Sequence, residues 1–165
     1  LIATGSHPVR PPIAGMDSPG VHPCWTLEDA RAIMALAKPG ARVLQLGAGF
    51  IGCIILEALA SKNVKLTVVE MGDRMVPRMM TEVAGNLIKT WVEEKGIAVH
   101  TNTKVESITQ SQSGLLVKLS NGETIEVDLV ISATGVKPNI EFLKNSNLQI
   151  QRGILVNEQM QTSHH

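Results

Sequence analysis

The sequence predicts an α/β fold, a Rossmann-like three-layer domain with a parallel sheet and an antiparallel β-meander crossover. Two observations predict this class. Short apolar runs that suit buried parallel strands alternate with helical patterns between residues 41 and 100. After Ile97 the period of the apolar residues changes from helical to alternating, which indicates antiparallel strands in place of another helix. We expect helices on both faces of the sheet and a meander from about Val105 to Val127.

The first 25 residues are predicted to form the end of a buried strand and then an extended linker. Residues 1–6 run from apolar residues into a turn, and residues 7–25 are rich in proline and glycine. A helix is expected to begin at Thr26, because threonine caps helices and acidic residues follow it. A proline–glycine pair ends this helix after Ala37.

A βαβ unit is predicted next. Its strands lie around residues 43–46 and 66–70, with a helix between them over residues 50–61. Apolar residues recur at helical spacing along this helix, and we expect them to face the core. They are Ile51, Ile55 and Leu59.

A longer helix is predicted over residues 77–94, and a glycine at position 96 separates it from a third short strand over residues 97–100. Apolar residues recur along this helix as well, so we expect them to form a buried stripe. They are Val83, Leu87, Ile88 and Trp91.

The meander is predicted from alternating apolar residues and from one strong hairpin signal. The pair Asn121-Gly122 favours a tight turn between two antiparallel strands. The three predicted strands cover residues 105–108, 115–119 and 124–127. Residues 129–135 then read as a further buried strand that ends in glycine.

The turn between the first strand and helix of the βαβ unit carries the pattern Gly-x-Gly-x-x-Gly. Gly47 permits a tight turn, and Gly49 removes the Cβ that would block the approach of a pyrophosphate. Gly52 lets the helix pack closely on the strand. The unpaired N–H groups at the start of the helix, around Phe50 and Ile51, favour phosphate binding.

The second strand of the unit ends in Glu70, whose carboxylate suits the ribose hydroxyls of an adenosine and would repel a 2′-phosphate. Together with the glycine turn, this acid predicts a dinucleotide site with a preference for NADH. The alternatives are a purely structural glycine turn and an exposed acid at a strand end. Arg74 and Arg78 either contact adenine or phosphate, or remain solvated.

Composition excludes several other functions. The net charge is zero, aromatic residues make up 2%, and there is no tyrosine, so we expect no nucleic-acid or anionic membrane surface. No apolar run is long enough to span a membrane. Cys24 and Cys53 lie too far apart for a redox pair or a zinc site, and the histidines have no clustered partners, so no metal is expected. Sparse cysteines suit the cytoplasm.

The tripeptide Ala-Thr-Gly occurs at residues 3–5 and 133–135, flanking the Rossmann unit and its meander. This arrangement resembles the pyridine nucleotide-disulfide oxidoreductase superfamily over nearly the whole chain. The overall pattern is most similar to the rubredoxin- and ferredoxin-reductase-like, nitrite-reductase-like and CoA-disulfide-reductase-like members. The resemblance implies that an NAD(P)H domain is inserted into an FAD domain, and that the chain crosses between them at the Ala-Thr-Gly turns. Gly135 is therefore a candidate cofactor-binding residue.

The resemblance also implies a domain organisation. Residues 1–25 would be a stub of the flavin domain and a linker, and residues 26–135 the NAD(H)-binding domain. Residues 136–163 would return toward the flavin domain. The two histidines at 164–165 are either the start of a purification tag or native residues. The family's flavin-binding motifs would then lie outside this segment, and the missing FAD domain of the same polypeptide would be a partner.

The implied activity is transfer of hydride from NADH to FAD and then to an unidentified electron acceptor. We expect this segment alone to be inactive, to bind NADH weakly without flavin, and to self-associate through apolar surface that the flavin domain would cover. Ile54 occupies a position where many members carry a glutamate near the nicotinamide. This branch therefore either handles the nicotinamide differently or transfers hydride poorly.

Two other functions fit parts of the pattern. The chain could be a stand-alone NAD(H)-binding module without catalysis. It could also be an S-adenosylmethionine-dependent methyltransferase, whose glycine loop and acidic strand end are similar. The meander and the paired Ala-Thr-Gly turns argue against the methyltransferase.

Overall fold

A computed structural model describes residues 1–164 of the 165-residue chain. The chain divides into two compact units. The larger is Arg10–Gly135, and the smaller combines Leu1–Val9 with the segment from Val136 onward. Each is described separately.

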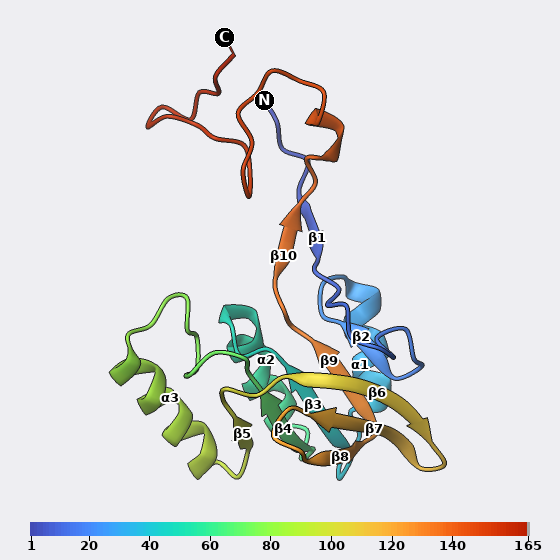
Figure 1. Cartoon of the computed structure of the whole chain (residues 1–165). Coiled ribbons are helices and arrows are strands. Elements are labelled where there is room, and N and C mark those ends of the chain that lie inside the picture. The colour runs from blue at the N-terminus through green and yellow to red at the C-terminus, as the bar shows by residue number, and fades with distance from the viewer. Residues whose placement is uncertain (165) are drawn as a thin grey trace. The chain divides into compact units, whose positions relative to one another are not determined.

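The larger unit is built around a parallel five-stranded sheet with the strand order β2-β9-β3-β4-β5 (Figure 1). The central strands are buried on both faces, which explains their nearly continuous apolar sequence. In sheet order the strands are β2 (Val21–Pro23), β9 (Leu129–Ser132), β3 (Arg42–Leu46), β4 (Lys65–Val69) and β5 (Ala98–His100).

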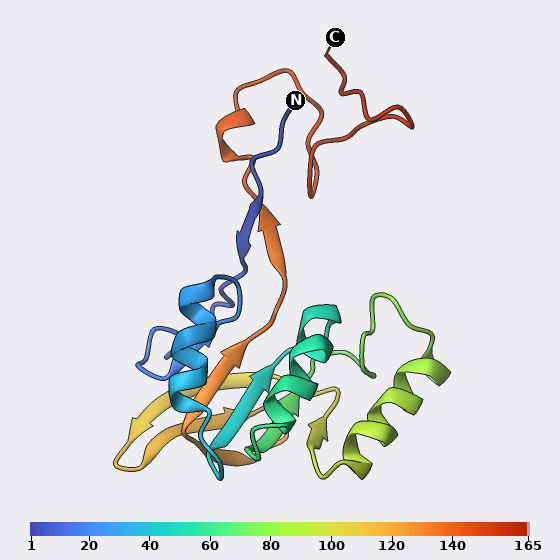
Figure 2. The ribbon, with the colours of Figure 1, turned by 180° about the vertical axis from the view of Figure 1, so that it is seen from behind.

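All three α-helices of the described chain pack on the same face of this sheet (Figure 2). They are α1 (Leu27–Leu36), α2 (Phe50–Ala60) and α3 (Glu82–Glu94). One core cluster joins residues of all three helices to β3, β4, β5 and β9. The expectation of helices on both faces is therefore wrong.

The opposite face is covered by the predicted meander, which forms a separate antiparallel sheet (Figure 1). Its strands are β6 (Val105–Ser111), β7 (Gly114–Leu119) and β8 (Thr124–Val127). Alternate residues of β7 are buried against the parallel sheet. The predicted hairpin is confirmed, since β7 and β8 pair and the Glu123 N–H donates to the Asn121 side chain at 3.1 Å. The three layers are thus helices, parallel sheet and meander.

A charged cluster ties the meander to β3. The guanidinium of Arg42 contacts Glu126 and Asp128, each at 2.6 Å, and donates to the Ser113 carbonyl at 2.8 Å. The bond from Arg42 lowers the pKa of the Asp128 carboxyl. The pKa of Glu126 is lowered first by the hydroxyl of Ser113 and then by Arg42.

Helix α2 exists as predicted but is rotated about its axis relative to the predicted face. Its buried residues are Gly52, Leu56 and Leu59, whereas Ile51 is exposed and Ile55 only half-buried. The glycine turn determines this orientation, because Gly52 is the residue that meets β3.

Helix α3 begins at Glu82, five residues later than predicted, and Thr81 caps it through the Ala84 N–H. Three residues of its predicted stripe are not buried: Val83, Leu87 and Trp91 are 71%, 66% and 57% exposed. The fourth, Ile88, is half-buried against the core, which the helix also contacts through Gly85 and Val92. The prediction is wrong for the three exposed residues, because periodicity identifies the apolar face of a helix but not the elements that cover it.

The predicted linker is partly a structural element. Residues 21–23 form β2, the edge strand beside β9, and Met16 is buried in the core beneath the meander. The Ile108 N–H also donates to the Ala14 carbonyl at 2.8 Å, which attaches this segment to β6. The backbone is extended at residues 21–23, as predicted, but there it is a strand of the sheet rather than a linker, and residues 15–20 form turns instead.

The smaller unit is held by a short antiparallel pair, β1 (Ser6–Pro8) and β10 (Val136–Pro138). Residues 1–5 are exposed and form no strand, so the predicted buried strand is wrong there. Asn139 binds the backbone of Thr4 through its side-chain nitrogen at 3.0 Å and His7 through its side-chain oxygen at 2.6 Å.

A single 3-10 turn, Glu141–Leu143, follows in this unit. The carboxyl of Glu141 has its pKa lowered to about 2, first by the hydrogen bond from Lys137 and then by that from Lys144. Of the predicted tag residues, His164 is exposed and His165 lies outside the described residues.

Candidate dinucleotide-binding site

The glycine turn lies where the carboxyl ends of three strands meet. It follows β3, its Gly47 N–H donates to the Val69 carbonyl at the end of β4, and it passes close to the residues after β9. Gly47 has φ +99°, and a Cβ there would lie 2.6 Å from the Ala133 carbonyl oxygen. Only glycine fits this turn, since both its conformation and the space exclude a side chain. The carboxyl edge of a parallel sheet is where α/β proteins bind ligands.

The other two glycines of the motif differ sharply in their surroundings. A Cβ on Gly52 would lie 2.6 Å from the Gly47 carbonyl oxygen and 2.7 Å from the Gln45 side-chain nitrogen. The predicted close packing of helix and strand is therefore confirmed. A Cβ on Gly49 would meet nothing within 4 Å. Its side of the turn faces open space, as a pyrophosphate would require.

Helix α2 leaves its N-terminal N–H groups without a side-chain cap. Within residues 1–164, α1 is capped by Thr26 and α3 by Thr81, whereas the N-cap of α2 is Gly49. Uncapped N–H groups and the helix dipole together attract an anion. The side chains of Phe50 and Ile51 are exposed beside these groups.

Glu70 connects the glycine turn to the loop after β4. Its carboxylate accepts the Ala48 N–H through Oε2 and the Gly72 N–H through Oε1, both at 2.7 Å. Each carboxylate oxygen can accept a second bond, and the residue is only half-buried. The carboxylate is thus held in place and retains capacity for ribose hydroxyls.

The two arginines of the following loop have different environments. Arg74 forms an ion pair with Asp73 at 2.7 Å and donates to the carbonyls of Pro77 and Met80, so its guanidinium is used within the loop. Arg78 is exposed and forms no ion pair within residues 1–164. The structure thus favours a structural role for Arg74 and leaves Arg78 solvated.

Gly135 ends the second Ala-Thr-Gly turn, directly after β9. It has φ +103°, and a Cβ there would meet nothing within 4 Å. The Ala133 carbonyl is the point where this turn approaches Gly47. The structure therefore brings the beginning of the second Ala-Thr-Gly turn next to the glycine motif.

Sequence reasoning did not identify Gln45, which lies on β3 beneath the glycine turn. It is fully buried and donates to the Gly47 carbonyl at 2.9 Å, while its side-chain oxygen has no hydrogen-bond partner within the described chain. The available signal was a polar residue within an apolar strand. Gln45 thus stabilises the glycine turn through its hydrogen bond to the Gly47 carbonyl.

An apolar surface adjoins the turn on α2. Phe50, Ile51 and Ile54 are all exposed, and the first turn of the helix contains no acidic residue. Cys53 lies half-buried beside them, and burial raises the pKa of its thiol, with a smaller contribution from the Glu70 charge. No thiolate or carboxylate of α2's first turn is therefore available for acid–base chemistry.

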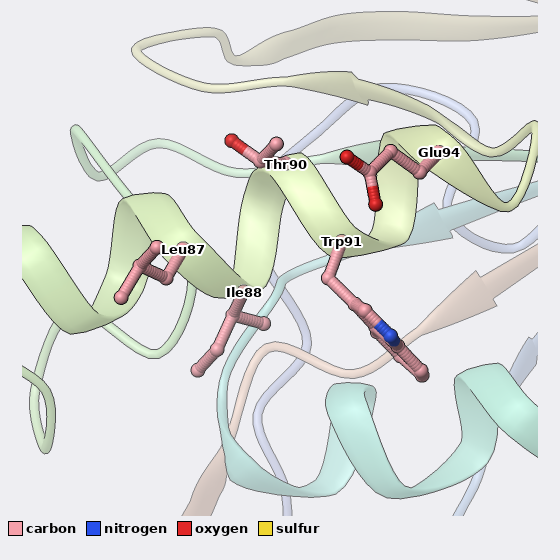
Figure 3. Close-up of a pocket in the computed structure, with 5 residues that line it drawn as sticks. All are labelled: Leu87, Ile88, Thr90, Trp91 and Glu94. Carbon is pink, nitrogen blue, oxygen red and sulfur yellow. The ribbon is translucent and has the colours of Figure 1, made fainter.

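A shallow hollow of about 450 Å³ lies on α3 (Figure 3). It is lined by Leu87, Ile88, Thr90, Trp91 and Glu94, and no residue of the glycine turn contributes to it. Three of the five lining residues are apolar, and the polar ones, Thr90 and Glu94, provide no cationic group for a phosphate. It is not the candidate site.

The described chain contains neither a side-chain cluster that could hold a metal ion nor a membrane-spanning helix. No group of three or more His, Cys, Asp or Glu side chains within residues 1–164 is placed to hold a metal ion. None of the helices of this part is long and apolar enough to cross a membrane.

Comparison with known proteins identifies relatives over nearly the full chain. Residues 1–165 match the profile of the family described as pyridine nucleotide-disulphide oxidoreductase. The chain is 34% identical to the epsilon subunit of NADH-dependent phenylglyoxylate dehydrogenase from Aromatoleum evansii, over 99% of this chain and 39% of the relative. It therefore spans about two fifths of that relative's length.

Solved structures with the same fold are also available. A ferredoxin reductase from Rhodopseudomonas palustris has a TM-score of 0.89 at 28% identity, covering 98% of this chain and 40% of that chain. A water-forming NADH oxidase from Lactobacillus brevis, bound to NADH, has a TM-score of 0.83 at 30% identity, covering 89% and 32%. The predicted Rossmann-like architecture is confirmed.

Proposed function

The chain belongs to the pyridine nucleotide-disulphide oxidoreductase family, and on this basis we propose that it is the NAD(H)-binding domain of a flavin-dependent oxidoreductase. Residues 26–135 would bind the nucleotide, while residues 1–25 and 136–163 would lead from and to the flavin domain. The observation that carries the proposal is the uncapped N-terminus of α2 beside the open side of Gly49, with the fixed carboxylate of Glu70.

Each part of the nucleotide would have its own binding group. The pyrophosphate would accept N–H bonds from the start of α2, around Phe50 and Ile51, where the dipole favours negative charge. The adenosine ribose would donate to Glu70, which would repel the 2′-phosphate of NADPH. Gly135 would line the turn at which the chain leaves the nucleotide-binding domain.

The residues of the site supply binding and orientation, and the cofactors supply the chemistry. These residues would hold NADH, which would supply the hydride that the parent enzyme would transfer to FAD and then to an unidentified acceptor. The surface formed by Phe50, Ile51 and Ile54 would exclude water beside the nicotinamide. With an isoleucine at position 54, no carboxylate there would bind the carboxamide or exchange protons.

The parent's partners and location are part of the same proposal. Its partners would be the FAD domain of the same polypeptide and a separate electron acceptor, with no nucleic acid or membrane surface. A cytoplasmic location is supported by two free cysteines, Cys24 and Cys53, which form no disulfide in the described chain.

The proposal is tested by titrating the 165-residue chain with NADH and following nucleotide fluorescence. We expect weak, saturable binding, no bound flavin in the visible spectrum, and no reduction of dye acceptors by NADH. A yellow protein, or one that reduces dyes, would show that the flavin site is present here. S-adenosylmethionine serves as the comparison ligand, and tighter binding of it than of NADH would support the methyltransferase instead.

A further inference from the structure

One side chain, that of Arg74, forms hydrogen bonds across the loop of residues 71–80 between β4 and α3. Arg74 donates from Nε to the Met80 carbonyl at 3.0 Å and from Nη2 to the Pro77 carbonyl at 3.3 Å. Its Nη1 contacts both carboxylate oxygens of Asp73, at 2.7 and 2.9 Å. All three nitrogens are used within the loop, and the side chain is only 23% exposed.

This loop also forms a backbone hydrogen bond to the glycine turn. Val76 has φ +49°, a left-handed conformation that is costly for a β-branched residue and persists only where its surroundings impose it. In this conformation its N–H donates to the Ala48 carbonyl at 2.8 Å. The Ala48 N–H donates to Glu70. Both polar groups of Ala48 are therefore occupied, one by the loop and one by Glu70.

Helix α3 supports the loop from the other side. A Cβ on Gly85 would lie 2.7 Å from the Met75 carbonyl oxygen and 2.9 Å from Cβ and Cδ of Arg74. The Met75 side chain is fully buried. The loop thus lies directly on α3 and has little freedom to shift, as long as Arg74 keeps its contacts.

From these contacts we propose that Arg74 is a positioning residue for dinucleotide binding, an inference that rests on the proposed function. It holds residues 71–80 in the one conformation from which Val76 fixes Ala48 in the glycine turn. The turn is then ordered before the nucleotide arrives, so binding does not incur the cost of ordering it. Arg74 is not a ligand of the nucleotide's phosphates.

Two substitutions at one position separate this role from phosphate binding. Arg74→Lys keeps the positive charge but replaces a planar fork by a single ammonium, which does not reach the same three acceptors. Arg74→Gln removes the charge as well. Arg78→Gln is the matched control, because it makes the same charge change four residues away on an exposed side chain that forms no ion pair with any described residue.

The first measurement is amide hydrogen exchange in the 165-residue chain without nucleotide. Both Arg74 variants are expected to exchange the Ala48 and Val76 amides about tenfold faster or more, the effect of losing one charge-assisted hydrogen bond. Arg78→Gln leaves both amides within about twofold. Unchanged protection in Arg74→Gln overturns the proposal.

The second measurement is the Kd for NADH and for NADPH, well below the melting temperature, so that global unfolding does not contribute. Both Arg74 variants are expected to weaken both nucleotides by the same factor, about tenfold. Full affinity in Arg74→Lys, or a loss confined to NADPH in Arg74→Gln, identifies a phosphate ligand and overturns the proposal.

The proposed function fails separately, if the wild-type chain shows no saturable NADH binding, and the exchange measurement still decides whether Arg74 orders the turn.

Discussion

At the scale of single residues, the second and third glycines of the motif, Gly49 and Gly52, have opposite surroundings. Gly49 faces open space with an ordinary φ of −71°, whereas Gly52 is in contact with the backbone of Gly47. An added methyl group should therefore affect nucleotide binding at Gly49 and the packing of α2 at Gly52. Each substitution serves as the control for the other.

Gly49→Ala is expected to weaken NADH binding about tenfold or more, because its methyl group enters the space that the pyrophosphate approaches. Its free energy of unfolding should stay within about 0.5 kcal/mol of wild type. Gly52→Ala should lose about 1–3 kcal/mol of stability through overpacking. Urea unfolding and NADH titration measure the two effects, and a stable Gly52→Ala would contradict the described helix packing.

Glu70 is expected to determine the preference for NADH over NADPH. Glu70→Arg should narrow or reverse the ratio of the two Kd values, because repulsion of the 2′-phosphate becomes attraction. The arginine also loses the bonds to Ala48 and Gly72, so both affinities should fall. Glu70→Gln is the control that removes the charge at similar size, and it should narrow the ratio without reversing it. Equal binding of both nucleotides by the wild-type chain would show that the carboxylate does not face the ribose.

At the scale of elements, the attachment of the meander to β3 should depend on pH. The pKa values of Glu126 and Asp128 are lowered in the folded state, so the proton binds the unfolded chain more readily. Their stabilising contribution is complete above their unfolded pKa values of about 4 and is lost as the pH falls through the folded ones. We expect the melting temperature to fall steeply in that acidic range.

Asp128→Asn tests this attachment. The variant should be less stable than wild type at neutral pH and should show a shallower loss of melting temperature on acidification, because one of the linked carboxyls is gone. The exposed carboxyl of Glu106, which pairs with Lys118 within the meander at 2.8 Å, provides the control Glu106→Gln. A wild-type acid profile in Asp128→Asn would contradict the role of the cluster.

The elements also show where sequence reasoning succeeded and where it stopped. Periodicity located α2 and the meander strands, because burial of one face imposes the period directly. It misjudged the start of α3, since the carbonyls of Pro77 and Met80 are held by Arg74, a contact no local pattern reveals. Whether the apolar stripe of α3 is buried depends on which elements pack beside the helix. The sequence of the helix alone does not determine this.

Part of the candidate site could also be predicted from the sequence. Gly47, Gly49, Gly52 and Glu70 were predicted as site residues because a dinucleotide would require a particular residue type at each position. The sequence did not predict the hydrogen bond from Gln45 to the Gly47 carbonyl or that from the Val76 N–H to the Ala48 carbonyl. Both depend on contacts that form only in the folded chain. The change from helical to alternating periodicity predicted that strands rather than another helix follow residue 100. It did not show which face of the parallel sheet these strands cover.

At the scale of the whole molecule, the exposed apolar stripe of α3 should cause weak self-association. Leu87 lies at the middle of this stripe and lines the hollow on α3. Leu87→Asn should shift sedimentation toward the monomer and leave the free energy of unfolding within about 0.5 kcal/mol, because the side chain is largely exposed. Asn86→Ala, on the same exposed turn, is the control. A wild-type chain that stays monomeric at all concentrations would contradict this expectation.

The pairing of β1 with β10 makes the larger unit an insertion between two neighbouring points of the smaller one. Pro8 and Val136 are partners in this pair, so the chain enters and leaves the larger unit at adjacent residues. A segment with neighbouring ends can be removed, or transferred to another host, without stretching what remains. The larger unit can therefore be excised, or replaced by another domain, by cutting the chain at these two strands.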